Sequence, residues 1–86
     1  DNWGKDAKTA LQEWLQGRRL TVPIYRIVET RGQAHAQLFE VECAVQALNL
    51  SKRGTGKSRR AAEQDAASRV LDELLERDTP DGPLHS

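Results

Sequence analysis

The chain has 86 residues, and 13 Lys and Arg residues balance 13 Asp and Glu residues, so its formal net charge is zero. This length fits a single domain, and the lack of both a run of about 18 apolar residues and a signal-peptide pattern argues against membrane insertion and secretion. The single cysteine, Cys43, excludes an intrachain disulfide, and with only two distant histidines it does not make a structural zinc site. We therefore expect a cytoplasmic location, where thiols stay reduced.

The first half of the chain predicts one helix and two strands. Asp6 is a suitable N-cap for a helix, and Gly17 is a suitable C-cap. Between them, apolar residues recur at helical spacing, at Ala7, Ala10, Leu11, Trp14 and Leu15. Residues 24–30 are rich in β-branched and aromatic types and predict a strand, while residues 31–35 predict a loop. A second strand is indicated by alternating apolar positions, Phe39, Val41, Cys43 and Val45.

The second half predicts a third strand and a second helix. After a turn at 46–47, residues 48–52 indicate a weaker strand and residues 54–57 a glycine-rich loop. Ser58 would cap a helix with an apolar stripe made of Ala62, Ala66, Val70, Leu71, Leu74 and Leu75. We expect residues 6–76 to form an α+β domain of order α-β-β-β-α, with two helices on one face of a three-stranded antiparallel sheet. Residues 1–5 are interpreted as an interdomain linker and residues 77–86 as a disordered tail.

Basic residues are concentrated in residues 52–61, which hold five cations and no acid. Three of them, Lys57, Arg59 and Arg60, lie at the predicted start of the second helix. Cations there oppose the helix dipole by about 0.3–1 kcal/mol each. Together with the free N–H groups of the helix start and the Ser58 hydroxyl, they favour a phosphate site over an ordinary solvated surface.

A nucleotide-binding P-loop is a second interpretation of this segment. The run Gly56-Lys57-Ser58 ends as that motif does, but Ser51 stands where the motif needs a glycine. No further strand is predicted that could carry the acidic residue for magnesium. A nucleotide binder is therefore the less favoured interpretation.

Polar side chains line one side of the first predicted helix. Their spacing of i, i+3, i+4 and i+7 places on one stripe Thr9, Gln12, Glu13 and Gln16. The stripe is either an ordinary wet helix face or a surface for ribose 2′-hydroxyls and base edges, because Gln both donates and accepts. Gln33 and His35 lie in the loop after the first strand, and His35 lacks the partners of a metal site.

An ordered set of motifs spans residues 8–67. The set comprises Lys8-Thr9-x-Leu11-Gln12-Glu13-x-x-Gln16, Pro23-x-Tyr25, Gly32-Gln33-Ala34-His35, Phe39, and Gly54-x-Gly56-x-Ser58-Arg59-Arg60-x-Ala62-Glu63-Gln64-x-Ala66-Ala67. This set resembles double-stranded RNA-binding domains. The opening motif and the Glu63-Gln64 pair resemble most the domain at the C-terminus of bacterial ribonuclease III.

The resemblance implies a three-part contact with A-form RNA. Such domains span about 16 base pairs and recognise shape, phosphates and 2′-hydroxyls rather than sequence. The first helix would contact one minor groove, the loop the next, and the basic helix start the phosphates between them. The implied RNA-binding residues are Thr9, Gln12, Glu13, Gln16, Gln33, His35, Lys57, Ser58, Arg59 and Arg60. Glu63 and Asp65 depart from the wider family, which has a basic residue and an alanine there, and both predict weaker binding through negative charge near the RNA.

The motifs that match the family contain no catalytic residue and no metal ligand, so we expect neither nuclease activity nor a cofactor in these residues. A magnesium-dependent nuclease domain, and homodimerisation through it, would belong to the parent protein, and the fragment would be monomeric. We expect double-stranded RNA as the partner and no membrane. A protein–protein interaction module of the same fold is the alternative.

Overall fold

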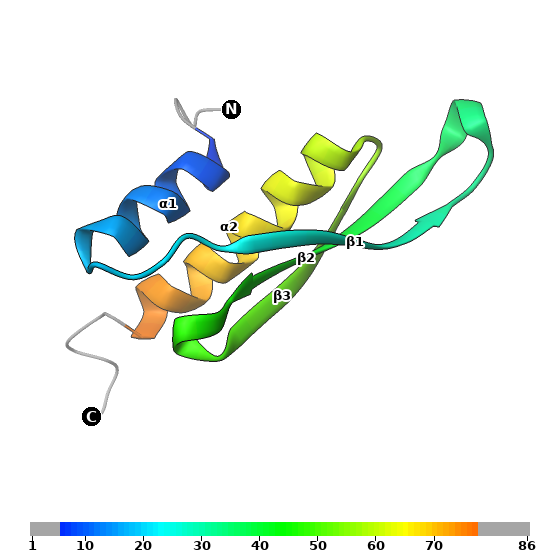
Figure 1. Cartoon of the computed structure of the whole chain (residues 1–86). Coiled ribbons are helices and arrows are strands. Elements are labelled where there is room, and N and C mark those ends of the chain that lie inside the picture. Colours follow the sequence, from blue (N-terminus) through cyan, green and yellow to red (C-terminus); the bar gives the residue numbers. More distant parts are fainter. Residues whose placement is uncertain (1–5, 78–86) are drawn as a thin grey trace.

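A computed structural model describes residues 6–77. Along the chain lie α1 (Ala7–Gly17), β1 (Ile24–Arg31), β2 (Leu38–Val45), β3 (Leu50–Gly56) and α2 (Arg59–Arg77), with short 3-10 turns at Ala34–Ala36 and Gln46–Leu48. The strands form one antiparallel sheet of order β1-β2-β3. Both helices lie on one face of it (Figure 1). The predicted α-β-β-β-α order is thus confirmed.

The predicted boundaries of the domain need one correction. Arg77 was assigned to the tail but is the last residue of α2. Its Nε donates to Glu73 at 3.1 Å, an i,i+4 pair that supports the final helical turn. The predicted linker, 1–5, and the rest of the predicted tail, 78–86, lie outside the described residues.

The hydrophobic core lies between the helices and the covered face of the sheet. Its largest fully buried side chains come from α1, β2 and α2, and they are Leu11, Leu15, Val41, Cys43, Val45, Val70 and Leu74. Ala67 is also buried, whereas Leu75, predicted as part of the stripe, is 49% exposed. Burial raises the pKa of the Cys43 thiol to about 11, so the thiol is neutral at physiological pH and packs as an apolar group.

Two glycines bring α2 unusually close to β3. A Cβ atom on Gly54 would lie 2.2 Å from the backbone nitrogen of Ala66, and one on Gly56 would lie 2.6 Å from that of Ala62. Both glycines belong to β3, so the prediction of a loop at 54–57 was wrong for residues 54–56. The sequence suggests flexibility at these glycines, but their function is to leave room for a helix. Because β3 is antiparallel to β2, the strand and loop geometry of a P-loop is also absent here.

The end of α1 is formed by a Schellman motif. The N–H of Leu20 donates to the carbonyl of Leu15 at 2.9 Å, and the N–H of Arg19 donates to that of Gln16 at 3.0 Å. Arg19 is left-handed, with φ of 61°. Gly17 is the last helical residue, so it marks the end of the helix but does not supply the left-handed position.

Candidate nucleic-acid interface

The start of α2 is built as the sequence predicts. Ser58 caps the helix, because its Oγ accepts a hydrogen bond from the N–H of Ala61 at 3.1 Å. Lys57, Arg59 and Arg60 are all exposed at this end. Three cations, the polar end of a helix and a serine hydroxyl therefore share one surface, which suits an anion.

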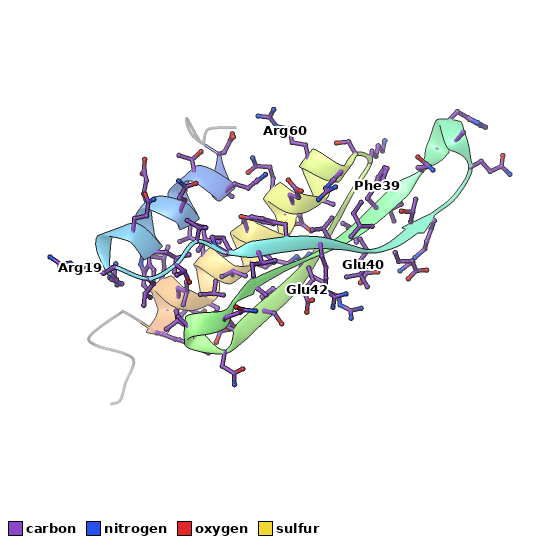
Figure 2. All side chains as sticks on the ribbon, viewed as in Figure 1. Arg19, Phe39, Glu40, Glu42 and Arg60 are labelled. Carbon is purple, nitrogen blue, oxygen red and sulfur yellow. The ribbon has the colours of Figure 1, made fainter. Side chains whose placement is uncertain are left out.

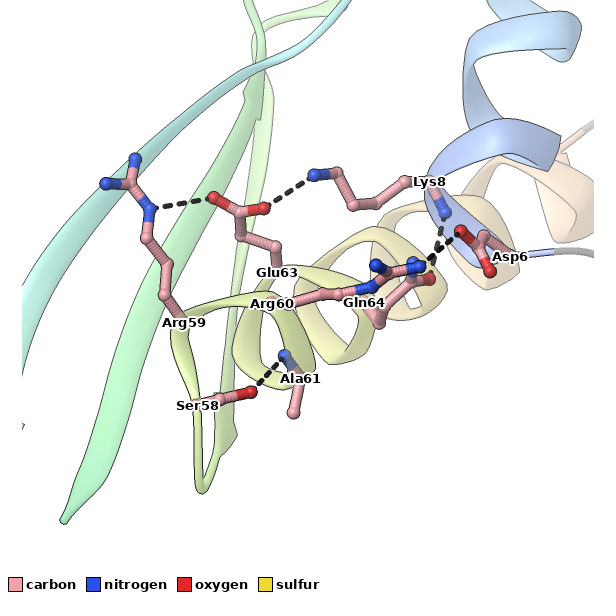
Figure 3. Close-up of polar contacts among 8 residues, drawn as sticks. All are labelled: Asp6, Lys8, Ser58, Arg59, Arg60, Ala61, Glu63 and Gln64. Atoms are coloured by element: carbon pink, nitrogen blue, oxygen red, sulfur yellow. Dashed lines mark hydrogen bonds and ion pairs between the residues drawn. The ribbon is translucent and has the colours of Figure 1, made fainter.

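The two arginines of this surface are not isolated charges (Figure 3). Nε of Arg59 donates to Glu63 at 2.9 Å, and Arg60 lies 3.5 Å from the carboxylate of Asp6. Their side chains nevertheless remain 56% and 78% exposed. Each guanidinium can therefore still present N–H groups to a phosphate.

The remaining predicted contacts lie on either side of this helix start. On α1 the exposed polar stripe consists of Thr9, Gln12, Glu13 and Gln16. A shallow pocket joins it to α2, with Thr9, Gln12 and Arg60 among its lining residues. Gln33 and His35 are exposed at the tip of the β1–β2 hairpin, which extends away from both helices (Figure 1).

A second shallow pocket joins the hairpin to the basic residues. Its lining includes His35 from the turn and Lys57 from the segment before α2. The basic start of α2 therefore lies between α1 and the hairpin. The structure brings the predicted residues together as three neighbouring groups, on α1, on the hairpin and at the start of α2.

Two basic residues of the segment 52–61 lie elsewhere. Lys52 pairs with Glu73 of α2 at 3.3 Å, and Arg53 pairs with Glu40 at 3.4 Å on the uncovered face of the sheet. In a strand, successive side chains point to opposite faces. Only three of the five cations can therefore contribute positive charge to the surface at the start of α2.

The uncovered face of the sheet carries paired charges. Arg26 bonds to Glu42 at 2.8 Å, and Arg31 bonds to Glu40 at 3.0 Å. Figure 2 shows Glu40 and Glu42 pointing to the side of the sheet opposite to Arg60. The arginines at the start of α2 are paired too, but Lys57 and the N–H groups of a helix start lie beside them, so that surface suits a phosphate better than this face does.

Asp65, which departs from the wider family, lies where α2 meets the edge of the sheet. Its Oδ2 accepts a hydrogen bond from the N–H of Thr55 at 2.9 Å, and it also pairs with Arg69 at 3.2 Å. Because β3 is an edge strand, this N–H has no neighbouring strand to bond with. Asp65 therefore satisfies a backbone N–H at the sheet edge.

Three residues that contact the interface were not among the predicted site residues. Lys8, Glu63 and Gln64 form a hydrogen-bonded cluster between α1 and α2 (Figure 3). The motif containing Glu63 and Gln64 was visible in the sequence, but nothing in the spacing indicated Lys8 as their partner, 55 and 56 residues away.

Residues 6–77 contain no group of three or more His, Cys, Asp or Glu side chains that could hold a metal ion. Neither helix in this range has the length and hydropathy that crossing a bilayer requires.

Comparisons with a family model, with related sequences and with solved structures agree with the resemblance drawn from the motifs. Residues 7–74 match the family model of the double-stranded RNA binding motif. The chain is 63% identical over 73 residues to Ribonuclease 3 of Delftia acidovorans, covering 85% of this chain and 32% of that protein. It is 58% identical over 72 residues to Ribonuclease 3 of Bordetella avium, covering 84% of this chain and 29% of that protein. The chain thus spans about a third of the length of these relatives.

Among solved structures, the chain is similar to one of Arabidopsis HYL1, described in connection with miRNA processing. The TM-score is 0.69 and the sequence identity 35%, over 80% of this chain and 96% of that one. The fold, the motif set and the match over residues 7–74 agree. The chain belongs to the double-stranded RNA-binding motif family and resembles the domain of that family found in bacterial ribonuclease III.

Proposed function

We propose that this domain binds double-stranded RNA as the substrate-binding part of a ribonuclease III-like endoribonuclease that processes RNA. The observation that carries the proposal is the arrangement of three exposed polar groups, on α1, on the hairpin tip and at the start of α2. The arginines on the uncovered face of the sheet lie away from this helix start and pair with Glu40 and Glu42.

Each group suits a different part of an A-form duplex. The stripe Thr9, Gln12, Glu13 and Gln16 offers donors and acceptors to 2′-hydroxyls in a wide, shallow minor groove. Gln33 and His35 would reach the next minor groove. Lys57, Ser58, Arg59 and Arg60 would bind phosphates across the narrow major groove between them, because that groove admits no side chains to its bases.

The nuclease reaction belongs to the rest of the parent protein in this proposal. We expect that part to supply the catalytic carboxylates, to bind magnesium, and to hold two chains together as a dimer in the cytoplasm. The domain described here would bind RNA as a monomer without cutting it, because metal-assisted cleavage needs a cluster of carboxylates on a rigid site.

The arginines at the start of α2 provide the test. Replacing Arg59 and Arg60 by alanine should weaken RNA binding and make the slope of log K against log salt shallower by about 1.8, at about 0.9 per lost phosphate contact. We expect the free energy of unfolding to change by no more than about 0.5 kcal/mol, because losing the bond to Glu63 offsets the removal of two cations from the helix start.

The control replaces Arg26 and Arg53 by alanine. These arginines carry the same charge but lie on the uncovered face of the sheet, so the salt slope should stay at the wild-type value. Both double variants and the wild type are titrated with one RNA duplex at several salt concentrations, and their urea unfolding is recorded. An equal loss in both variants, or an unchanged slope in the first, would contradict the proposed placement of the RNA.

A further inference from the structure

The first turn of α1 is capped by a side chain of α2. Asp6 occupies the N-cap position but makes no capping hydrogen bond with its side chain. Instead, the backbone N–H of Lys8 donates to Oε1 of Gln64 at 3.2 Å (Figure 3). Because the first N–H groups of a helix have no partner within it, this bond attaches the start of α1 to α2.

Glu63 joins the same two helices through the side chain of Lys8. Its carboxylate accepts hydrogen bonds from Nζ of Lys8 at 2.5 Å and from Nε of Arg59 at 2.9 Å. Burial by itself would raise the pKa of Glu63, but the hydrogen bonds from Lys8 and Arg59 outweigh burial and lower that pKa below its ordinary value. Because the Glu63 side chain is only 12% exposed, solvent screens this bridge less than it screens a surface ion pair.

Lys8 also contacts the sheet. Its ammonium lies 4.9 Å from the centre of the Tyr25 ring on β1, within the range of a cation–π interaction. The backbone and side chain of one α1 residue are thus bound to α2 and β1 together. This arrangement leaves α1 little freedom to shift along α2.

The cluster lies between two of the proposed RNA contacts. Glu63 and Gln64 line the same shallow pocket as Thr9 and Gln12 of α1 and Arg60 of α2. Any movement of α1 against α2 would change the distance between the polar stripe and the basic residues. The cluster therefore helps to fix that distance, together with the buried packing of Leu11 and Leu15 against α2.

We propose that Glu63 and Gln64 are positioning residues that set the preference of the domain for A-form duplexes, an inference that rests on the proposed function. A-form RNA has a shallow, wide minor groove beside a narrow major groove, whereas B-form DNA has a narrow minor groove beside a wide major groove. The distance from the minor-groove surface to the phosphates across the major groove therefore differs between them. Contacts held at a fixed distance fit one form, while loosely joined contacts adapt to both and lose conformational freedom when they bind.

The replacement of Gln64 by methionine tests the cap. Methionine has a similar length but offers no strong acceptor to the N–H of Lys8. We expect affinity for an RNA duplex to fall about tenfold, the equivalent of about 1.4 kcal/mol, and affinity for a DNA duplex of the same length to stay near the wild-type value. The RNA-to-DNA affinity ratio should then fall about tenfold. Gln64→Glu restores an acceptor, and because its added charge weakens binding to both duplexes, the ratio should return to the wild-type value.

Glu63→Gln separates positioning from simple electrostatics. If Glu63 acted only as a negative charge near the phosphates, its removal would strengthen binding to RNA and DNA alike. If it positions Lys8 and Arg59, its removal weakens the bridge and lowers both the affinity for RNA and the RNA-to-DNA ratio. The two accounts therefore predict opposite changes in RNA affinity.

Asp65→Ala is the matched control for general destabilisation. It also removes a side-chain acceptor from a backbone N–H, but at the sheet edge by Thr55, so its RNA-to-DNA ratio should stay at the wild-type value. All variants are titrated at temperatures where circular dichroism shows them folded. A wild type that does not prefer RNA would overturn the proposed function itself. A wild type that prefers RNA, with an unchanged ratio in folded Gln64→Met, would overturn only the positioning role.

Discussion

The Schellman motif that ends α1 places a non-glycine residue in the left-handed region. Arg19 holds this position with φ of 61°, where a Cβ atom costs about 1–2 kcal/mol. The motif lets Leu20 turn back towards the core, against which it packs. Gly17, two residues earlier, has open space where its Cβ would lie and lies within the helix. Sequence reasoning located the end of the helix correctly but assigned the special backbone position to the wrong residue.

The end of α1 therefore predicts that glycine is favourable at position 19 and unfavourable at position 17. Arg19→Gly should raise the free energy of unfolding by about 1 kcal/mol, because it removes the left-handed strain. Gly17→Ala should also stabilise, by about 0.5–1 kcal/mol, because alanine is the better helix residue. Urea unfolding measures both, and Arg19→Ala, which loses the charge but keeps Cβ, is the control and should bring no comparable gain. A loss of stability in Gly17→Ala would mean that Gly17 is the left-handed residue after all.

At the scale of elements, the contact between α2 and β3 depends on small residues on both sides. Gly54 and Gly56 on the strand face Ala66 and Ala62 on the helix, at distances that leave no room for a Cβ on the strand. The sequence predicted these alanines as part of the apolar stripe of the helix, but it could not show that the glycines opposite them belong to a strand. Glycine is depleted in strands, so the pattern favoured a loop until the packing partner was known.

Gly54→Ala should therefore destabilise the domain strongly. The new Cβ would meet backbone atoms of Ala66, which cannot move aside as a side chain can, so α2 must shift away from the sheet. We expect a loss of about 3 kcal/mol or more in urea unfolding, a large fraction of the stability of a small domain. Thr55→Ala, on the exposed position between the two glycines, should cost no more than about 1 kcal/mol. Similar losses in both variants would contradict the close packing.

At the scale of the whole molecule, the charges divide between two surfaces although their sum is zero. The uncovered face of the sheet pairs its arginines with Glu40 and Glu42. The arginines at the start of α2 also have acidic partners, Glu63 and Asp6, but the exposed Lys57 and the N–H groups of a helix start add positive charge there. The local run of basic residues predicted the second surface, because it is contiguous in sequence. The first depends on strand register, which composition does not contain.

Features that depend on local spacing could be predicted from the sequence, whereas contacts between residues far apart in the chain could not. The polar stripe of α1 and the cap of α2 follow from local spacing and were predicted correctly. The cluster of Lys8, Glu63 and Gln64 joins residues more than 50 positions apart and becomes visible only when α1 is docked on α2. The bond between Asp65 and the N–H of Thr55 was not predicted for the same reason, because it depends on how α2 lies against the sheet.

If three surface groups together recognise the A form of a duplex, the domain distinguishes RNA from DNA, and this difference can be measured directly. The wild-type domain is titrated with an RNA duplex of about 20 base pairs, longer than the expected footprint of about 16, and with a DNA duplex of the same sequence and length. We expect a clear preference for RNA at every salt concentration, because only RNA offers 2′-hydroxyls and the A-form groove spacing, while affinity for both duplexes falls as salt rises. Equal affinity for the two duplexes would contradict it.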